Sequence, residues 1–241
     1  MNLEAITDPA NILINISEST CMQLLPASLT DLISHSCNHL RRIFPKGTRI
    51  DSSNLDPLVF WRSGSQIASL NWQVYDTGMQ FNEALFVGSP GWVPKPKEMR
   101  KEVVSSGAFT KEKLKQRIVV EIVGVSSRQS CFSFFVPWRD LFDGISPVPA
   151  PNGCEGKSFH TYIKAQLFHS SSDLSWRSQT LETRHDPQSG ADLLWKEQFE
   201  WYYEEDDLSF IKFVARCSLD IFMPDLRLLK TRDLSRRSGE R

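Results

Sequence analysis

The spacing of apolar residues in the first hundred positions predicts short helices alternating with short strands. Residues 17–40 carry apolar side chains at helical spacing, so we expect a helix there. Pro26 should interrupt this helix, and Ser28 resembles the N-cap of its second part. Residues 57–62 read as a second, short helix. Three apolar runs predict strands, at residues 42–47, 66–74 and 91–94. This order favours an α/β arrangement with parallel strands.

From about residue 116 onward, apolar residues recur with a period of two. Four runs rich in β-branched and aromatic residues predict antiparallel strands, and they are residues 117–123, 161–168, 195–202 and 210–215. An all-β sandwich is the natural interpretation of this half. The pattern therefore predicts an α/β domain at 10–105, a charged linker at 106–115, a sandwich at 116–222 and a solvated basic tail at 223–241.

Composition narrows the class of protein without naming a function. The 241 residues are 40% hydrophobic and carry a net charge of -1, which is ordinary for a globular protein and gives no reason to expect nucleic-acid binding. No apolar run approaches the roughly 18 residues of a membrane span, and the first residues do not form a signal peptide. The five cysteines lack any CxxC pairing, which favours free thiols in a reducing, cytoplasmic compartment.

Familiar catalytic motifs are missing from the sequence. His35 and His39 have helical i, i+4 spacing, but no HExxH pattern or nearby third ligand accompanies them, so we expect a helix surface and not a zinc site. There is no GxSxG nucleophile motif and no glycine-rich phosphate loop.

Residues 40–54, LRRIFPKGTRIDSSN, resemble the start of the Y box of eukaryotic phosphoinositide-specific phospholipase C. The resemblance continues through QIASLNWQ at 66–73 and through Gly91-Trp92-Val93. The second half resembles the C2 domain that follows the Y box in this family, chiefly in Tyr162-Ile-Lys164 and in DLSFIKFV at 207–214. The resemblance thus implies half of a TIM-type barrel followed by a C2-like sandwich.

In this family the barrel has two halves, X and Y. The X half supplies the catalytic histidines and the carboxylates that hold calcium, and the Y half supplies the remaining strands and part of the inositol-phosphate pocket. The reaction hydrolyses phosphatidylinositol 4,5-bisphosphate to diacylglycerol and inositol trisphosphate. The resemblance therefore implies a phosphoinositide lipid at a membrane surface as partner, and calcium as cofactor.

Three substrate-binding positions carry over from the family. Arg42 matches an arginine that contacts a ring phosphate, and Phe44 stands where the family has a tyrosine stacked on the inositol ring. Asn15 takes the place of a phosphate-binding serine. Two of the three differ from the family residue, and Pro94 replaces a leucine in an expected barrel strand.

The catalytic residues of the X half have no counterpart in these 241 residues. His35 and His39 match positions of the Y helix, so they are not the catalytic pair. We therefore expect no catalysis by this chain alone, and an open apolar barrel face that an X-box segment or a partner protein would cover. In the C2-like half, the family's D-x-D loop reads Arg216-Cys217-Ser218-Leu219 with only Asp220 near, so calcium ligands are not expected there either.

Two hypotheses stay open at this point. The chain is a C-terminal piece of a phosphoinositide phospholipase C, or it is a non-catalytic module that binds a membrane, a phosphoinositide or a partner. A third reading is the product of an incomplete gene model, which the sequence does not distinguish from the non-catalytic module.

Overall fold

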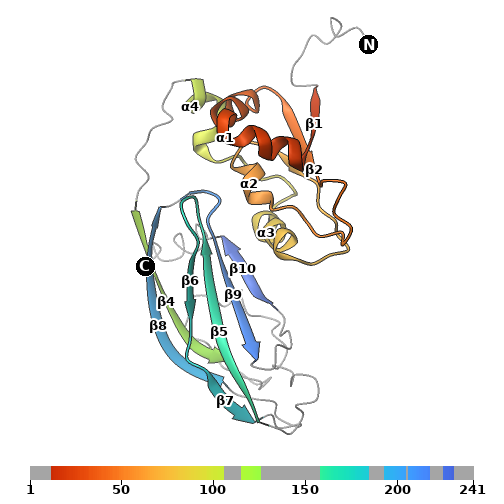
Figure 1. The fold of residues 1–241 in the computed structure, drawn as a ribbon. Helices are drawn as coiled ribbons and strands as arrows, with labels where there is room; N and C mark the ends of the chain where they lie inside the picture. The colour runs from red at the N-terminus through yellow and green to blue at the C-terminus, as the bar shows by residue number, and fades with distance from the viewer. Residues whose placement is uncertain are drawn as a thin grey trace, which may run out of the picture. The chain divides into compact units, whose positions relative to one another are not determined.

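The structure, a computed structural model, divides into two units. The first contains Met1–Lys113 with Asp206–Leu208, and the second contains Leu114–Glu205 with Ser209–Arg241. Figure 1 labels the helices and strands of each unit. The described residues are 12–105, 115–125, 158–184, 193–204, 206–217 and 225–230.

The first unit is built on a three-stranded parallel sheet in the order β1-β2-β3, with helices between the strands. The register pairs Asn15 with Arg42 and Arg42 with Ile67. The parallel α/β organisation that the sequence predicts is thus confirmed. The elements are β1 (Leu13–Ser17), α1 (Glu18–His35), β2 (Leu40–Phe44), α2 (Pro57–Trp61), β3 (Ile67–Ala68), α3 (Thr77–Phe86), a 3-10 turn (Lys97–Met99) and α4 (Lys101–Ser105).

Helix α1 shows the interruption that its sequence predicts. Ser17 caps its start, because the Ser17 hydroxyl accepts a hydrogen bond from the Thr20 amide at 3.1 Å. Pro26 lies inside the helix, and Ser28 leaves the helical region with φ -130° and ψ 24°. A proline provides no N–H and its ring crowds the turn that precedes it. The break nevertheless falls two residues after Pro26, at Ser28, the residue expected to cap the second part of the helix.

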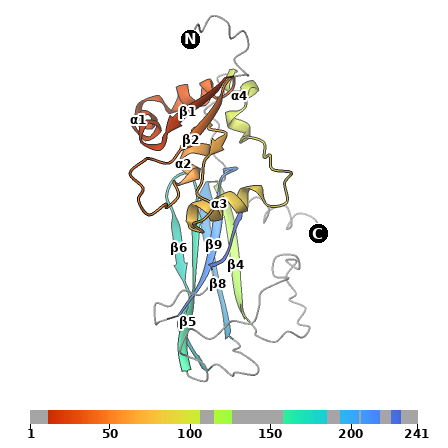
Figure 2. The same cartoon turned by 90° about the vertical axis from the view of Figure 1, so that its right-hand side faces the viewer.

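The core of the first unit lies on one face of this sheet. Buried Cys21 of α1 packs with Ile43 of β2, Leu55 and Phe60 of α2. Helix α1 runs along this side of β1 and β2 (Figure 2). Burying each of the large apolar side chains contributes about 1.5–3 kcal/mol. The opposite face of the sheet carries the remaining side chains of β1 and β2.

Two predicted strands in this unit are wrong in part or in full. The strand expected at 66–74 is only two residues long in β3, and 91–94 forms no strand. Gly91 has φ +91°, outside the strand region, and Pro94 provides no N–H for a sheet. Four elements were not predicted, namely β1, α3, the 3-10 turn and α4. Helix α3 begins after Asp76, whose carboxylate accepts a hydrogen bond from the Met79 amide at 3.2 Å.

The second unit is an antiparallel sandwich. One sheet has the strand order β10-β9-β5-β6, with β7 also pairing to β5, and the other pairs β4 with β8. All four strands predicted in this half are present, in the antiparallel arrangement expected. The strands are β4 (Lys115–Val125), β5 (Ser158–Phe168), β6 (Leu174–Arg177), β7 (Leu181–Arg184), β8 (Leu193–Glu204), β9 (Phe210–Cys217) and β10 (Asp225–Lys230).

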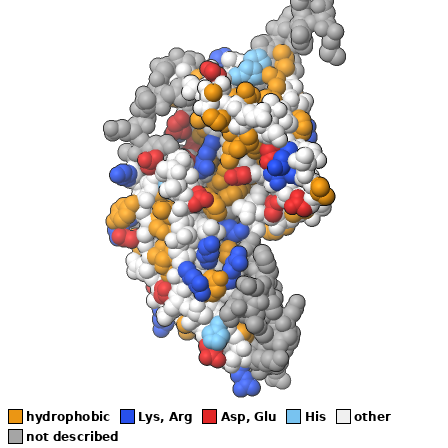
Figure 3. Space-filling model, viewed as in Figure 1, with side chains coloured by type: hydrophobic (Ala, Val, Ile, Leu, Met, Phe, Trp, Pro, Cys, Tyr) orange, Lys and Arg blue, Asp and Glu red, His pale blue; other side chains and the backbone are white. Residues whose placement is uncertain are grey.

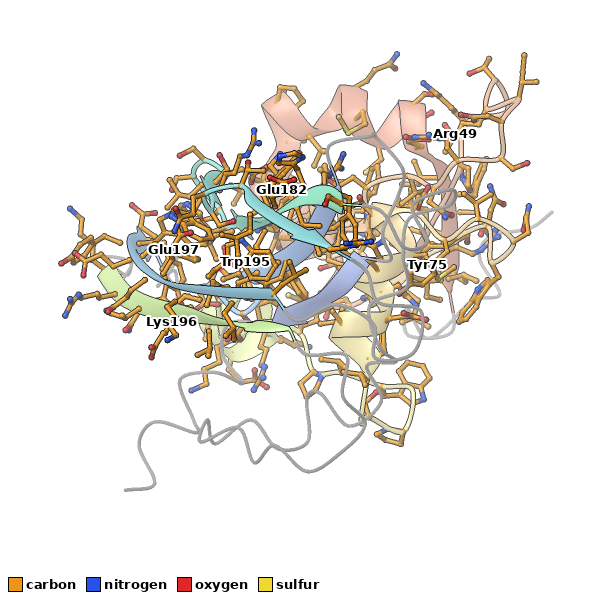
Figure 4. All side chains as sticks on the ribbon, turned by 90° about the horizontal axis from the view of Figure 1, so that it is seen from below. Arg49, Tyr75, Glu182, Trp195, Lys196 and Glu197 are labelled. Atoms are coloured by element: carbon orange, nitrogen blue, oxygen red, sulfur yellow. The ribbon has the colours of Figure 1, made fainter. Side chains whose placement is uncertain are left out.

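The sandwich core is rich in aromatic residues from both sheets. Trp176 of β6 stacks on Phe199 of β8 with ring centroids 4.3 Å apart. Figure 4 shows Trp195 pointing between the two sheets while the neighbouring Lys196 points away. The alternation of buried and exposed residues along β8 therefore follows the predicted period of two.

The outer surface of the five-stranded sheet is basic. Lys and Arg side chains gather over β5 and β6 (Figure 3), and the Arg177 guanidinium lies 3.7 Å from the ring centroid of Tyr162. This stack holds one cation against the strand.

Strand β10 lies inside the range 223–241 that we expected to be a solvated tail, so at least Asp225–Lys230 is part of the sandwich. Most of the predicted linker, residues 106–114, lies outside the described residues, and Lys115 already belongs to β4. Of the stretch 216–220, where calcium ligands are not expected, Arg216 and Cys217 belong to β9, and residues 218–220 lie outside the described residues.

Candidate functional site

Two of the three predicted substrate-binding residues lie side by side on the sheet face that α1 leaves uncovered. Asn15 and Arg42 are register partners in β1 and β2, and Arg42 Nη1 donates a hydrogen bond to Asn15 Oδ1 at 3.3 Å. Phe44 follows two residues later, so it points to the same face, at the carboxyl end of β2, and is 36% exposed. The structure therefore places all three predicted residues on one surface.

This surface combines one cation with an unusual amount of exposed apolar area. Leu13, Leu40 and Ile67 lie on the same face as Arg42 and are each more than a third exposed. Parallel sheets are normally buried on both faces. The exposed apolar face that the resemblance implies is thus present in the first unit.

Arg41, the neighbour of Arg42, points to the opposite side and anchors the strand. It is fully buried, and its guanidinium donates to the Ser65 hydroxyl at 2.9 Å, the Leu32 carbonyl at 3.1 Å and the Ser63 carbonyl at 2.5 Å. Burial lowers the pKa of Arg41. The tandem arginines therefore have different roles, and only Arg42 faces the candidate site.

The loop that follows Phe44 is fixed to the start of α1 by an ion pair. The Glu18 carboxylate accepts hydrogen bonds from Arg49 Nε at 2.9 Å, from Arg49 Nη2 and from the Lys46 amide at 3.1 Å. Arg49 also donates to the Ser53 hydroxyl at 2.9 Å. Figure 4 shows Arg49 beside α1. These contacts position the chain at the carboxyl end of β2, next to Phe44.

A second network joins the loops that follow β2 and β3. Asn54 Nδ2 donates to the Val74 carbonyl and to Asp76 Oδ1, each at 3.0 Å, and Asn71 Nδ2 donates to the Ser52 carbonyl at 2.8 Å. These hydrogen bonds therefore fasten the two loops to each other. They expose Ile50 and Trp72, which are 97% and 76% exposed.

Sequence reasoning missed the supporting roles of Arg41, Glu18 and Arg49, which hold the strand and the loop that carry the site. The alternation in LRRIF already indicates that adjacent arginines face opposite sides of a strand. No comparable local signal connects Glu18 to Arg49, because 31 residues separate them.

The paired histidines do not form part of the site. The rings of His35 and His39 stack with centroids 4.2 Å apart at the end of α1, which is the amino end of β2 and not the end that carries Phe44. Burial lowers the pKa of His35, and His39 and Arg41 lower it further. Within the described ranges, no group of three or more His, Cys, Asp or Glu side chains could hold a metal ion. The described residues therefore do not fit a calcium site, and no step through calcium follows from them.

A sequence model of the family described as phosphatidylinositol-specific phospholipase C, Y domain, matches residues 2–98. Residues 2–98 therefore form a phospholipase C Y domain. The match contains Asn15, Arg42 and Phe44 and ends before the second unit begins.

Individual relatives agree with this assignment. The 1-phosphatidylinositol 4,5-bisphosphate phosphodiesterase 1 of Candida albicans is 44% identical over 79 residues, which are 32% of this chain and 7% of that protein. Human inactive phospholipase C-like protein 2 is 28% identical over 187 residues, which are 77% of this chain and 15% of that protein. The chain thus spans a small part of the length of these relatives.

The fold of both units is also that of a phospholipase C. The crystal structure of L. pealei PLC21 has a TM-score of 0.66 and 21% sequence identity, and the match covers 91% of this chain and 26% of that one. The predicted fold class, a half TIM-type barrel followed by a C2-like sandwich, is confirmed.

Proposed function

We propose that the Y domain supplies the phosphate-binding surface of a phosphoinositide phospholipase C site. The observation that carries this proposal is the pairing of Arg42 with Asn15 on the uncovered sheet face. Arg42 Nη1 is held by Asn15, while Nε and Nη2 donate to no other group in the described part of the chain. Two adjacent guanidinium donors suit a bidentate grip on a phosphate, and Asn15 Nδ2 can donate to the same group.

Phe44 supplies the second kind of contact. Its ring lies at the carboxyl end of β2, two residues beyond Arg42, about 7 Å along the strand. An inositol ring whose phosphate binds Arg42 can therefore rest against the Phe44 ring. The ring offers apolar contact and, unlike a tyrosine, no hydroxyl.

Exposed apolar residues on the loops that follow β2 and β3 support action at a membrane surface. Ile50 and Trp72 follow the carboxyl ends of β2 and β3, the end that also carries Phe44. Tryptophan favours the interface of a bilayer, and isoleucine gains free energy by leaving water. Among the residues that the structure describes, no helix combines the length and apolar character that crossing a bilayer requires. The exposed Ile50 and Trp72 lead us to propose peripheral association with a cytoplasmic membrane face.

The reaction of the complete enzyme would be hydrolysis of phosphatidylinositol 4,5-bisphosphate to diacylglycerol and inositol trisphosphate. The described residues bind and orient the head group in this proposal. Proton transfer and calcium binding are assigned to a complementary X half or a partner, because His35 and His39 lie at the wrong end of β2. The chain alone should therefore bind phosphoinositide without hydrolysing it.

A second candidate function is a non-catalytic binding module. The match to human inactive phospholipase C-like protein 2 extends through both units of this chain and favours it. The two candidates share the phosphate contact at Arg42 and differ in whether the site can take part in hydrolysis.

One experiment separates them. The purified chain is mixed with the separately expressed N-terminal barrel half of an active relative, and release of inositol trisphosphate from vesicles is measured. Restored hydrolysis that Arg42→Ala abolishes would support the enzyme. Binding to vesicles that needs Arg42, without hydrolysis in the mixture, would support the module. Calcium-dependent hydrolysis by the chain alone would refute our assignment of the chemistry to other residues.

A further inference from the structure

A second cationic feature lies at the other end of the first unit's sheet. A cavity of about 360 Å³ is lined by residues that include Cys37 and Gln66, which precede β2 and β3. The strands are parallel, so this is the amino end of the sheet, whereas Phe44 is at the carboxyl end. The cavity is therefore separate from the surface that carries Arg42.

The lining of this cavity has an excess of positive charge. Lys95, Arg100 and Lys101 face a single acidic residue, Glu102. None of the ion pairs in the described part of the chain includes any of these three cations. The charge of the cations is thus not neutralised by the protein residues that the structure describes.

Lys95 is held in place and partly removed from water. Its ammonium donates to the Ser36 carbonyl at 2.6 Å and to the Ser36 hydroxyl at 2.9 Å, so that among the described residues one of its three N–H groups has no acceptor. Burial lowers the pKa of Lys95, because its charge has lost part of its hydration. A bound anion would restore that stabilisation.

Arg100 is fastened to the same segment. Its Nε donates to the Lys95 carbonyl at 2.9 Å, and its terminal guanidinium nitrogens donate to no group in the part of the chain that the structure describes. Lys101 follows directly and is exposed. One guanidinium fork beside two ammonium groups is a donor set that suits the several oxygens of a phosphate.

We propose that this cavity binds a small molecule bearing a phosphate monoester, at a site distinct from the Arg42 surface. Its volume of about 360 Å³ leaves room for an organic group beside the phosphate. A soluble phosphate monoester and a lipid phosphate head group share this chemistry. The proposal does not depend on the function proposed for Arg42.

Cys37 provides a built-in reporter of occupancy. It lines the cavity as a free, half-buried thiol, and its sulfur lies 3.7 Å from the Met99 carbonyl oxygen. Cys21 is a free thiol of the same unit, buried in the core and away from the cavity lining, and serves as the internal comparison.

The test follows alkylation of each cysteine of the full chain by iodoacetamide, using peptide mass spectrometry, while inorganic phosphate replaces chloride at constant ionic strength. Line broadening of the phosphorus-31 resonance of phosphate gives a second, thiol-independent readout. We expect saturable protection of Cys37 and broadening of the resonance. Lys101→Ala, which removes no hydrogen bond within the described residues, should reduce both effects, and adding Arg100→Ala should weaken phosphate affinity by about tenfold or more.

Arg42→Ala is the matched control and should leave Cys37 protection unchanged, whatever it does to phosphoinositide binding. Circular dichroism of each variant confirms folding. Protection by glucose 6-phosphate identifies a soluble ligand, while protection only by phosphatidylcholine vesicles containing phosphatidic acid identifies a lipid head group. The proposal is overturned if phosphate acts no differently from chloride in both readouts, or if the Arg100→Ala, Lys101→Ala double variant retains the effects.

Discussion

Replacing Glu18 tests whether the ion pair at the start of α1 holds the loop beside Phe44. The Glu18 and Arg49 side chains are only 12% and 19% exposed, and the carboxylate accepts three hydrogen bonds. Glu18→Gln keeps the size of the side chain and removes its charge. Glu18→Ala removes the acceptor altogether and leaves Arg49 without its carboxylate.

The expected loss of stability follows from these contacts. A hydrogen bond to a charged group contributes about 1.5–3 kcal/mol, and removing one partner of a buried pair costs more than the pair contributes. Because the site is near the surface, we expect about 1–2 kcal/mol for Glu18→Gln and about 3 kcal/mol for Glu18→Ala. The loss should be local to the first turn of α1 and the loop.

The effect should also depend on pH. The hydrogen bond from Arg49 is the largest factor lowering the pKa of Glu18, although burial acts in the opposite direction. A carboxyl group whose pKa is lower in the folded state stabilises the fold at pH values above its unfolded pKa, about 4.3. This contribution is lost as the pH falls through the folded pKa. The advantage of the wild type over Glu18→Gln should therefore be full at pH 7 and shrink below about pH 4.

Hydrogen exchange read by mass spectrometry is the appropriate assay, because it reports the opening of individual segments. Peptides covering residues 13–25 and 43–53 should lose protection in Glu18→Gln, while sandwich peptides should not change. A cycle with Arg49→Ala should give a coupling energy of about 1–3 kcal/mol. Equal protection in wild type and variant at pH 7, or a difference that persists unchanged at pH 3, would refute the reasoning.

Two further predictions concern the packing under the site, both read by urea unfolding of the full chain. Arg41→Ala should destabilise the first unit by at least about 3 kcal/mol, because the buried Ser63 carbonyl loses its guanidinium donor and the Leu32 carbonyl keeps only the Ser36 amide; a loss below about 1 kcal/mol would contradict it. Gly64→Ala should cost about 2–3 kcal/mol, because Gly64 has φ +84° and a Cβ there would lie 2.3 Å from Ser36 Oγ. Gly47→Ala is its control, because nothing lies within 4 Å of a Cβ at Gly47, and equal effects at both positions would refute the argument.

The strands of the sandwich could be predicted because their signal is local. A period of two with aromatic and β-branched residues defines β4, β5, β8 and β9 within single segments. Strands β6 and β7 are four residues each, too short for a period to be distinguished, and β10 alternates charged with apolar residues in a way that also suits a solvated tail.

The Y domain was harder to predict because its elements depend on tertiary contacts. Helix α3 contains Gly78, which propensity disfavours, yet a Cβ there would lie 2.6 Å from the Leu55 carbonyl, so glycine is required by packing. The five residues of β1 are too few to show a period, and their pairing with β2 depends on register.

For the site, the family resemblance indicated which residues bind substrate, and the structure showed which of them lie next to one another. Arg42 and Phe44 share a face because they are two residues apart on one strand, which the sequence alone can indicate. That Asn15 meets Arg42 required the parallel register of β1 with β2. The Glu18–Arg49 pair required the fold of the loop between them.

The central claim is that Arg42 binds an inositol phosphate, and titration calorimetry with soluble inositol 1,4,5-trisphosphate tests it most directly. Arg42→Ala should weaken binding by about tenfold or more, because a charge-assisted contact to phosphate is lost. Arg117→Ala, which removes an exposed arginine paired with Glu200 in the other unit, should leave the affinity unchanged. Equal affinities of the wild type and Arg42→Ala would contradict the account.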